Sequence, residues 1–463
     1  MRRIFILLIS IIVCVGDLPA QTISYTDDDQ WKAYDDFNKV FLDTKKNIYR
    51  DYSDRANAVD RWNGAAAIWC QAIYFDMALN AYRRAEAVGD KSHRAKYKLL
   101  AQHIYEGEKA QYCSFDFHNN NTNTGWFVYD DIMWWTCALA RAYELFGRKE
   151  YLTFSEKSFC RVWYGSTTVG DDGSYADPAR GLGGGMFWEW QPIENPKPHK
   201  AGDFRSACIN FPTVIAACLL HQLVPEDRKA PSAQPPSYQT KDAYLEKAKE
   251  IYAWADNTLV KSGRVADGIH GGPAEFNNHL YNQATYIGAS CLLYIITGDS
   301  LYLDKACAAA DYVFNKMSTN YILPLETGVE QGIYHAIFAQ YLHLLVYDCG
   351  RTEYLPYVEK NIETGWKNRD QTRGISNCRF NTLTKSDERV ESYTASGLPA
   401  LMLMFPVGDS TDAINEMHAT DSQASASVYT IDGQLVKDKA TPSDMSSLHR
   451  GMYIYNRRKM MVH

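Results

Sequence analysis

Two adjacent acidic residues, Asp130 and Asp131, stand directly before an apolar stretch that begins at Ile132 and continues through Trp134 and Trp135. Cleavage of a glycosidic bond uses one carboxylic acid to protonate the leaving oxygen and a second carboxylate as nucleophile or general base. Neighbouring Cα atoms lie about 3.8 Å apart. Two adjacent carboxyls therefore approach the roughly 5 Å separation of a retaining site more easily than the wider inverting one. The pair indicates a catalytic site that acts on sugars.

The local sequence places this pair at the start of a helix. Asn, Thr and Gly residues crowd positions 119–125, and helical spacing of apolar residues begins only at Ile132. Residues i and i+1 do not share a face of a regular helix, so Asp130 and Asp131 can converge only at its first turn. The partial positive charge there helps to keep one of them ionised. The alternative is that Asp130 is an N-cap and Asp131 an ordinary first-turn acid.

Aromatic residues supply candidate platforms for a sugar ring. The glycine triplet 183–185 precedes Trp188 and Glu189. Glycines let the backbone approach a ligand closely, an indole face stacks on a pyranose, and a carboxylate accepts hydroxyl hydrogen bonds. The alternative is a tight turn with its Trp packed in the core. Trp134 and Trp135 are further candidate platforms, although adjacent helical positions face different ways and either could belong to the core.

Polar side chains recur near the starts of other apolar helices. Tyr281, Asn282 and Gln283 precede the apolar run from residue 284, and their amides can donate to and accept from vicinal hydroxyls. Helix capping is the alternative. Asn210 and Asp267 lie near two more such starts, and Asp267 could instead form a turn with the following glycine. Because these motifs collect at one end of the helices, we take all five as candidate substrate-binding residues.

Hydrophobic periodicity predicts an all-α fold for most of the chain. Candidate helices alternate between nearly all-apolar and amphipathic, and a helix that is apolar on all sides belongs inside an assembly. Six apolar helices, each paired with an amphipathic one, predict a ring of six helical hairpins with a mouth at the N-terminal ends of the inner helices. An open superhelix is the alternative, but no repeat of fixed length is present. The predicted helices span 28–51, 66–87, 93–111, 131–147, 149–163, 207–224, 240–261, 276–297, 299–317, 332–349, 351–370 and 389–404.

The two ends of the chain differ from this helical body. Residues 1–20 combine Arg2 and Arg3 with a long apolar run and a cleavage site after Ala20, which predicts a signal peptide and export to the periplasm or cell surface. Lipidation of Cys14 is disfavoured by the large residue before it. We assign residues 21–405 to a catalytic domain, 406–426 to a linker and 427–463 to a small β-rich tail, because alternating segments appear only there.

The composition limits the classes of partner that the protein can bind. The chain has 463 residues, 46% of them hydrophobic, and a formal charge of −7, so it can bury a large core while its acidity argues against a nucleic-acid partner. No transmembrane segment is predicted after the signal peptide. The 11 cysteines form no CxxC pair and sit mainly in apolar helices, which predicts buried free thiols. No metal-binding His pattern is present, so we expect no metal and no cofactor. We expect a monomer.

Four motifs in order carry a resemblance to a known family: Asp-Asp followed by Trp-Trp, the Gly-Gly-Gly-x-x-Trp-Glu loop, Asn-x-Pro at 210–212 and Tyr-Asn-Gln at 281–283. Over residues 28–405 the chain resembles glycoside hydrolase family 76, which contains bacterial endo-α-1,6-mannanases and related fungal cell-wall proteins. It departs from the family pattern in two places. Ala284 stands where the family often has Gly, and Tyr-His-Ala at 334–336 replaces Phe-Lys-Gly.

The resemblance implies an (α/α)6 barrel and hydrolysis of α-1,6-mannosidic bonds with retention, with Asp130 as nucleophile and Asp131 as acid/base. The expected function is that of an exported endo-acting hydrolase of yeast-type mannan, binding α-mannan polysaccharide or oligosaccharide. Two alternatives stay open at this point. One is a mannan transglycosidase of the same fold, and the other is a non-catalytic glycan-binding protein at the cell surface.

Overall fold

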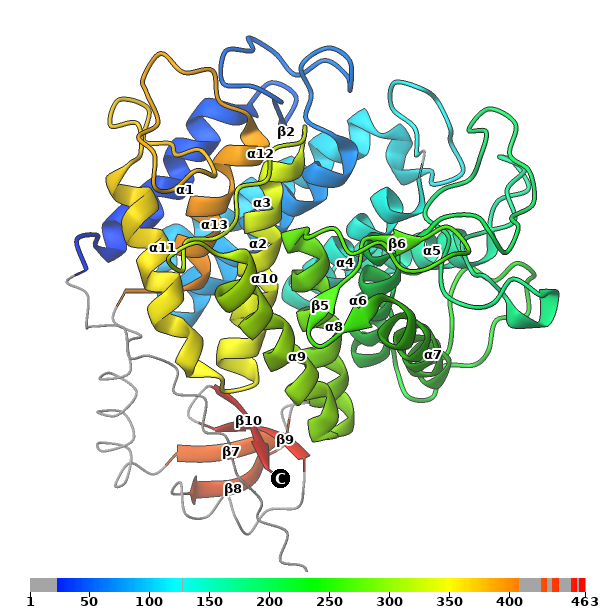
Figure 1. Cartoon of the computed structure of the whole chain (residues 1–463). Helices are drawn as coiled ribbons and strands as arrows, with labels where there is room; N and C mark the ends of the chain where they lie inside the picture. Colours follow the sequence, from blue (N-terminus) through cyan, green and yellow to red (C-terminus); the bar gives the residue numbers. More distant parts are fainter. Residues whose placement is uncertain are drawn as a thin grey trace, which may run out of the picture.

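The computed structural model describes residues 23–126 and 128–407, together with four strands between residues 426 and 462. The predicted signal peptide and most of the predicted linker lie outside the described residues. Helices run from near the start of the described chain to residue 404, and the C-terminal strands follow (Figure 1).

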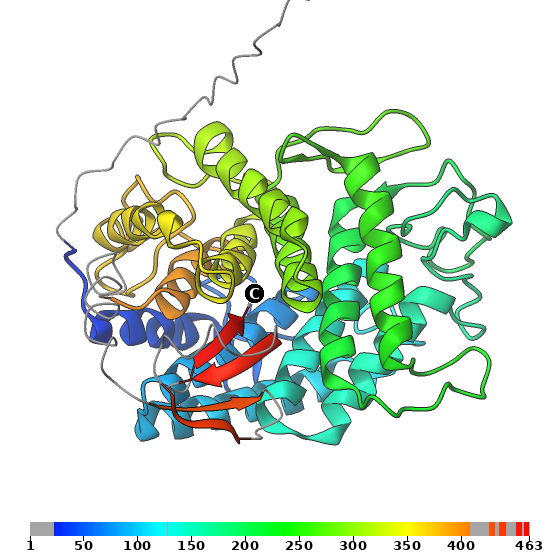
Figure 2. The same cartoon turned by 90° about the horizontal axis from the view of Figure 1, so that it is seen from below.

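The inner helices close into a ring. Each packs against the next in chain order, and the last, α13, packs back against the first, α2 (Figures 1 and 2). This closure confirms the predicted ring of six hairpins and rules out an open superhelix. The six inner helices are α2 (Ile68–Ala87), α4 (Tyr129–Phe146), α6 (Ala207–Leu223), α8 (Leu280–Thr297), α10 (Tyr334–His343) and α13 (Gly397–Met404).

Outer helices cover this ring, and their sequences show why. In α3 (Lys91–Gln111), the buried residues Tyr97, Ala101, Ile104 and Tyr105 recur at helical spacing on one face, while α6 buries almost every residue of its first three turns. Helices α3, α5, α7 and α9 each pack on the inner helix before them, and α1 and α11 pack on α13. The remaining outer helices are α1 (Asp27–Phe41), α5 (Lys149–Tyr164), α7 (Lys241–Leu259), α9 (Ser300–Tyr312) and α11 (Leu355–Lys367).

Several predicted helix boundaries were wrong. The helix predicted over 28–51 ends at Phe41, and a hairpin of β1 (Leu42–Asp43) and β2 (Ile48–Tyr49) follows. Asn47 turns this hairpin with a φ of 58°, a left-handed conformation that Asn tolerates. The helix predicted over 389–404 begins only at Ser392, as the short α12 (Ser392–Ala395) and then α13. The helices predicted over 299–317 and 332–349 finish in π-helical turns at Val313–Met317 and Leu344–Asp348.

Short connecting elements complete the barrel. Two-residue strands form two further antiparallel pairs near the mouth, β3 (Arg205–Ser206) with β6 (Gly268–Ile269) and β4 (Val260–Lys261) with β5 (Arg264–Val265). Single 3-10 turns lie at Cys113–Phe115, Pro178–Arg180, Gln331–Ile333 and Thr352–Tyr354. Most of these segments lie in loops that lead to inner helices, whereas the turn at Thr352–Tyr354 leads directly into the outer helix α11.

The C-terminal strands form one antiparallel sheet in the order β10-β9-β7-β8, which confirms the predicted small β-rich tail. In Figure 1 this sheet lies below the barrel, at the end opposite the loops that precede the inner helices. The strands are β7 (Ala426–Thr430), β8 (Leu435–Ala440), β9 (Gly451–Tyr455) and β10 (Arg458–Val462).

The ten cysteines from Cys70 to Cys378 are free thiols, and eight of them are buried, as predicted. Within the described part of the chain, no helix is long and apolar enough to span a bilayer. The same residues contain no group of three His, Cys, Asp or Glu side chains arranged to hold a metal ion.

Candidate active site

Asp130 and Asp131 lie in the first turn of α4, at the mouth of the ring. The N-cap is Val128, so the alternative that Asp130 merely caps the helix is wrong. The helix begins here because the preceding segment is tied to the Trp188 loop: Val128 forms a β-bridge with Glu189, and the Tyr129 N–H donates to the Trp188 carbonyl at 3.2 Å.

The two carboxyls differ in their surroundings. Asp130 is only 9% exposed, and its Oδ1 has no hydrogen-bond partner among the described residues, whereas Asp131 is half-buried. Burial raises the pKa of Asp130 to about 7, a rise that the Cys208 thiol and the Trp188 indole oppose. Burial also raises the pKa of Asp131 well above its usual range, and the neighbouring charge of Asp130 adds to the rise. Because like charges repel, the two carboxyls do not readily carry negative charge at the same time.

A buried ion pair supports the start of α4. The Arg161 guanidinium bonds Asp171 at 2.9 Å, and both side chains are completely buried. Asp171 Oδ2 also accepts from the Tyr129 hydroxyl at 2.6 Å, and Arg161 Nε donates to the Phe117 carbonyl at 3.0 Å. The network joins α5 to the loop before α4 and to the loop after α5, and it fixes Tyr129, the residue that immediately precedes Asp130.

Trp188 and Glu189 are partly exposed beside the acidic pair. The Glu189 carboxylate is near enough to Asp131 to raise the pKa of that acid, and burial raises the pKa of Glu189 itself. His199 lies 3.0 Å through Nε2 from the Glu189 carbonyl, while its Nδ1 lies 2.6 Å from Asp172. The structure therefore brings these two predicted residues to the site.

The glycine triplet has a structural reason rather than a ligand-binding one. Gly183, Gly184 and Gly185 all have positive φ, between 79° and 88°. A Cβ on Gly185 would lie 2.3 Å from the Trp254 ring, and one on Gly184 would lie 2.7 Å from it. The glycines let the loop turn against α7, and the turn carries Trp188 towards Asp130.

Asn210 does not reach the mouth. Its side chain is fully buried, accepts from the Met186 N–H at 2.9 Å, and donates to the carbonyls of Met186 and Ser206. The prediction that it contacts substrate is corrected, because its amide is fully used in holding the Trp188 loop on α6.

The Tyr-Asn-Gln motif divides by role. Tyr281 is partly exposed at the mouth, whereas Asn282 and Gln283 are fully buried. Asn282 donates to Asp267 Oδ1 at 3.2 Å and so orients that half-buried carboxylate. With its amide correctly oriented, Gln283 bonds the Gly263 carbonyl and the Val265 N–H, so it fastens the β4–β5 hairpin. Gln283 is corrected to a structural residue, and Asn282 to a residue that positions Asp267.

The two indoles after the acidic pair also lie inside. Trp135 is fully buried and donates through Nε1 to the Ile68 carbonyl at 2.8 Å. Trp134 is 2% exposed and packs against Trp69, with their ring centres 6.0 Å apart. Neither ring has a face open to solvent. The prediction that Trp134 and Trp135 are sugar platforms is therefore corrected, and both are core residues, with Trp134 lying beneath the mouth.

A set of rings from three inner helices forms what we call the aromatic floor: Trp69, Tyr281 and Tyr334. Tyr281 and Tyr334 are stacked with ring centres 4.0 Å apart and an interplanar angle of 5°. Trp69 continues the floor, 6.5 Å from Tyr334, and donates through Nε1 to Glu330 at 2.8 Å. His279 flanks both tyrosines, and Glu326 beside it raises the pKa of its imidazole.

Sequence reasoning missed Trp69, Cys208, His279 and Glu330. None belongs to a recognisable motif, yet each stands at or just before the first turn of an inner helix. The positional rule that selected Asp130 and Tyr281 could therefore have found them.

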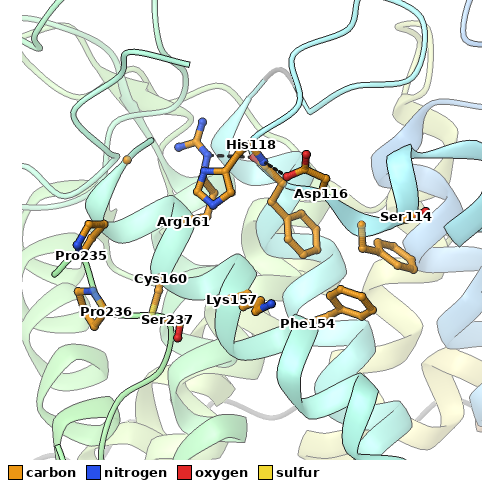
Figure 3. Close-up of a pocket in the computed structure, with 13 residues that line it drawn as sticks. Ser114, Asp116, His118, Phe154, Lys157, Cys160, Arg161, Pro235, Pro236 and Ser237 are labelled. Carbon is orange, nitrogen blue, oxygen red and sulfur yellow. Dashed lines mark hydrogen bonds between the residues drawn. The ribbon is translucent and has the colours of Figure 1, made fainter. Parts of the chain in front are cut away.

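A separate cavity of about 370 Å³ opens on the outer side of α5 (Figure 3). In Figure 3, Asp116 and His118 of the loop before α4 lie above Phe154 and Lys157 of α5, while Pro235 and Pro236 lie at the left. None of the residues that line it belongs to the acidic pair or the aromatic floor, so it is not the candidate active site.

Two adjacent carboxyls lie at the mouth of an (α/α)6 ring, beside an aromatic floor. A glycoside hydrolase uses such a pair of carboxyls for catalysis. A model of glycosyl hydrolase family 76 matches residues 33–406, and the chain belongs to this family. The predicted family and the predicted all-α barrel are thereby confirmed. No curated protein matches the chain.

Solved structures share the fold. An α-1,6-mannanase from a Salegentibacter species is 23% identical, with a TM-score of 0.63 over 82% of this chain and 98% of that one. A Listeria innocua protein is 22% identical, with a TM-score of 0.63 over 82% and 96%. A family 76 mannosidase from Bacteroides thetaiotaomicron is 17% identical, with a TM-score of 0.61 over 85% and 99%. Inactive variants of the Salegentibacter enzyme, with two adjacent aspartates replaced, were solved with α-1,6-mannotriose and α-1,6-mannotetrose.

Proposed function

We propose that this protein is a retaining endo-α-1,6-mannanase that cleaves the backbone of mannan across the mouth of the barrel. The observation that carries the proposal is the pair of adjacent carboxyls, Asp130 and Asp131, which lie in the first turn of α4 at the mouth of the ring. The Salegentibacter mannanase supports it, because replacing two adjacent aspartates leaves that enzyme inactive.

In this proposal Asp130 is the nucleophile. Its carboxylate attacks the anomeric carbon while Asp131 transfers its proton to the leaving glycosidic oxygen, which gives a glycosyl-enzyme ester and a free reducing-end fragment. The Asp131 carboxylate then takes a proton from a water molecule, whose oxygen attacks the same carbon and releases Asp130. Repulsion between the adjacent carboxyls favours a state in which one is ionised and the other protonated, which is the state that this mechanism requires.

The substrate contacts follow from the residues that remain open at the mouth. Trp188 and Tyr281 are partly exposed aromatic rings on which a pyranose can stack. Glu189 and Asp267 are partly exposed carboxyls that can accept bonds from hydroxyls. We assign substrate binding to these four residues.

The deciding experiment is product analysis after incubation with linear α-1,6-mannan. We expect a ladder of short oligosaccharides from the wild type, and none from folded Asp130→Asn or Asp131→Asn. Asp304→Asn on the exposed face of α9 is the matched control and should retain full activity. Products longer than an added acceptor would indicate a transglycosidase. Tight binding without new reducing ends would indicate a glycan-binding protein.

Export of the protein is also part of the proposal. We propose that a signal peptide is cleaved after Ala20, because an exported enzyme can reach mannan outside the cell. N-terminal sequencing of the mature protein should then begin at Gln21. A purified mature protein that still begins at Met1 would contradict this part of the proposal.

A further inference from the structure

One residue at the mouth has a backbone conformation that its side chain type disfavours. Glu330 lies before α10 with a φ of 70° and a ψ of −20°, in the left-handed region. This region is costly for a side chain with a Cβ, and such outliers cluster at functional sites.

The surrounding loop holds Glu330 in this conformation. The Gly328 N–H donates to Gln331 Oε1 at 3.0 Å, and the Gln331 N–H donates to the Gly328 carbonyl at 3.2 Å. Gly332 packs so tightly on α12 that a Cβ there would lie 2.4 Å from Thr394 Cγ2. The loop therefore keeps Glu330 in a strained conformation that glycine would adopt at no cost.

The side chain of Glu330 points to the aromatic floor. Its Oε2 accepts from Trp69 Nε1 at 2.8 Å, and Trp69 in turn packs against Tyr334 and Trp134. The carboxyl is only partly exposed, so water cannot fully solvate its remaining lone pairs. A carboxylate at the edge of an aromatic floor is the arrangement that holds a pyranose by its face and by its hydroxyls.

We propose that Glu330 is a further substrate-binding residue, whose carboxylate accepts hydrogen bonds from hydroxyls of the sugar unit over Trp69. This inference rests on the proposed function. It adds a second group of sugar contacts near Asp131, on α2 and on the loop before α10.

The charge of Glu330 also affects the acidic pair. Asp131 is faced by the carboxyls of Asp130, Glu189 and Glu330, and by the Arg61 guanidinium. The Glu330 charge raises the pKa of Asp131, and Arg61 lowers it. Removing the Glu330 charge should therefore lower the pKa of Asp131, so that the alkaline limb of the kcat/KM profile moves to lower pH.

The first test uses Glu330→Gln, which keeps the shape of the side chain and can still accept from Trp69. We expect kcat/KM on linear α-1,6-mannan to fall about 10- to 100-fold, the usual effect of losing a hydrogen bond to a charged group. In the inactive Asp130→Asn, Asp131→Asn background, affinity for α-1,6-mannotriose measured by calorimetry should fall by a similar factor. Glu353→Gln, an exposed charge after α10, is the matched control and should change neither value.

The second test separates the side chain from the backbone. Glu330→Ala and Glu330→Gly both remove the carboxylate, but only glycine relieves the positive φ. We expect Glu330→Gly to unfold at a higher temperature than Glu330→Ala, while both lose the same activity. A residue that serves only the loop would instead give activity that rises with stability from Ala to Gly.

These outcomes separate the inference from the proposed function. A wild-type protein that neither binds nor cleaves α-1,6-mannan refutes both. An active wild type with Glu330→Gln within twofold of it, and with unchanged mannotriose affinity, refutes only the role of Glu330.

Discussion

The Tyr129 hydroxyl donates to Asp171 Oδ2 at 2.6 Å, and Asp171 is in turn paired with Arg161 at 2.9 Å inside the protein. Tyr129 directly precedes Asp130, so the backbone that presents the proposed nucleophile is fixed from below by a buried ion pair. The order of the acids in the sequence sets their proximity, and this network sets the direction in which the first turn of α4 begins.

Removing one partner of the buried ion pair should cost more stability than removing both. Asp171→Ala leaves the Arg161 charge buried and unpaired, which should lower the free energy of unfolding by about 3–5 kcal/mol. Tyr129→Phe removes one hydrogen bond and should cost about 1–2 kcal/mol. Urea unfolding followed by tryptophan fluorescence measures both. Arg161→Met combined with Asp171→Leu should be less damaging than Asp171→Ala alone, and an equal loss would contradict a buried-charge penalty.

The activity should have a bell-shaped pH dependence. Burial raises the pKa of Asp130 to about 7, and this carboxyl must be ionised to attack, so kcat/KM should fall as the pH drops below about 7. The Trp188 indole lowers the pKa of Asp130. Trp188→Phe should therefore move the acid limb to higher pH, whereas Trp366→Phe on α11 should leave it in place. An acid limb that stays fixed in Trp188→Phe would show that the indole does not act on Asp130.

A fully buried acid in α3, Glu108, should make stability depend on pH. Neither oxygen of Glu108 in α3 has a hydrogen-bond partner among the described residues, and burial raises its pKa well above the usual range. The folded state therefore binds this proton more tightly than the unfolded state does. Stability should fall as the pH rises above the unfolded pKa of about 4.3, by about 1.4 kcal/mol per pH unit until the folded pKa is reached.

Glu108→Gln removes this titration. The variant should be more stable than the wild type at pH 8, and the two should converge as the pH approaches 4. Chemical unfolding curves across this range measure the difference. Parallel stability curves for the two proteins would show that Glu108 does not carry the penalty.

The glycine loop gives a steric prediction. Gly185→Ala places a methyl group against the Trp254 ring at a positive φ of 79°, which should cost about 2–4 kcal/mol and lower kcat/KM by displacing Trp188. Gly181→Ala has a similar φ of 75° with nothing within 4 Å of its Cβ, so it should cost only about 1–2 kcal/mol. Thermal unfolding and mannan hydrolysis measure the two effects. Equal losses in the two variants would indicate backbone strain alone.

The sequence by itself determined the ring and the position of the proposed catalytic pair. The alternation of apolar and amphipathic helices determines which helices form the inner ring. A helix such as α6 is apolar on all sides, and only the interior buries all of that surface. The tandem position of Asp130 and Asp131 fixes their separation through the peptide bond. Hairpin turns such as the one at Asn47 were missed, because a short strand pair interrupts the helical period over too few residues.

The tertiary structure alone decided which candidate side chains face the mouth. Side chains of types suited to sugars can still be unavailable, because their polar groups are hydrogen-bonded to buried backbone of another segment. This is the case for Asn210, Gln283 and Trp135. Glu330 and Trp69 are 261 residues apart and meet only because the ring closes. Periodicity tells which face of a helix is buried, but the partners that satisfy a polar group come from the packing of other helices and loops.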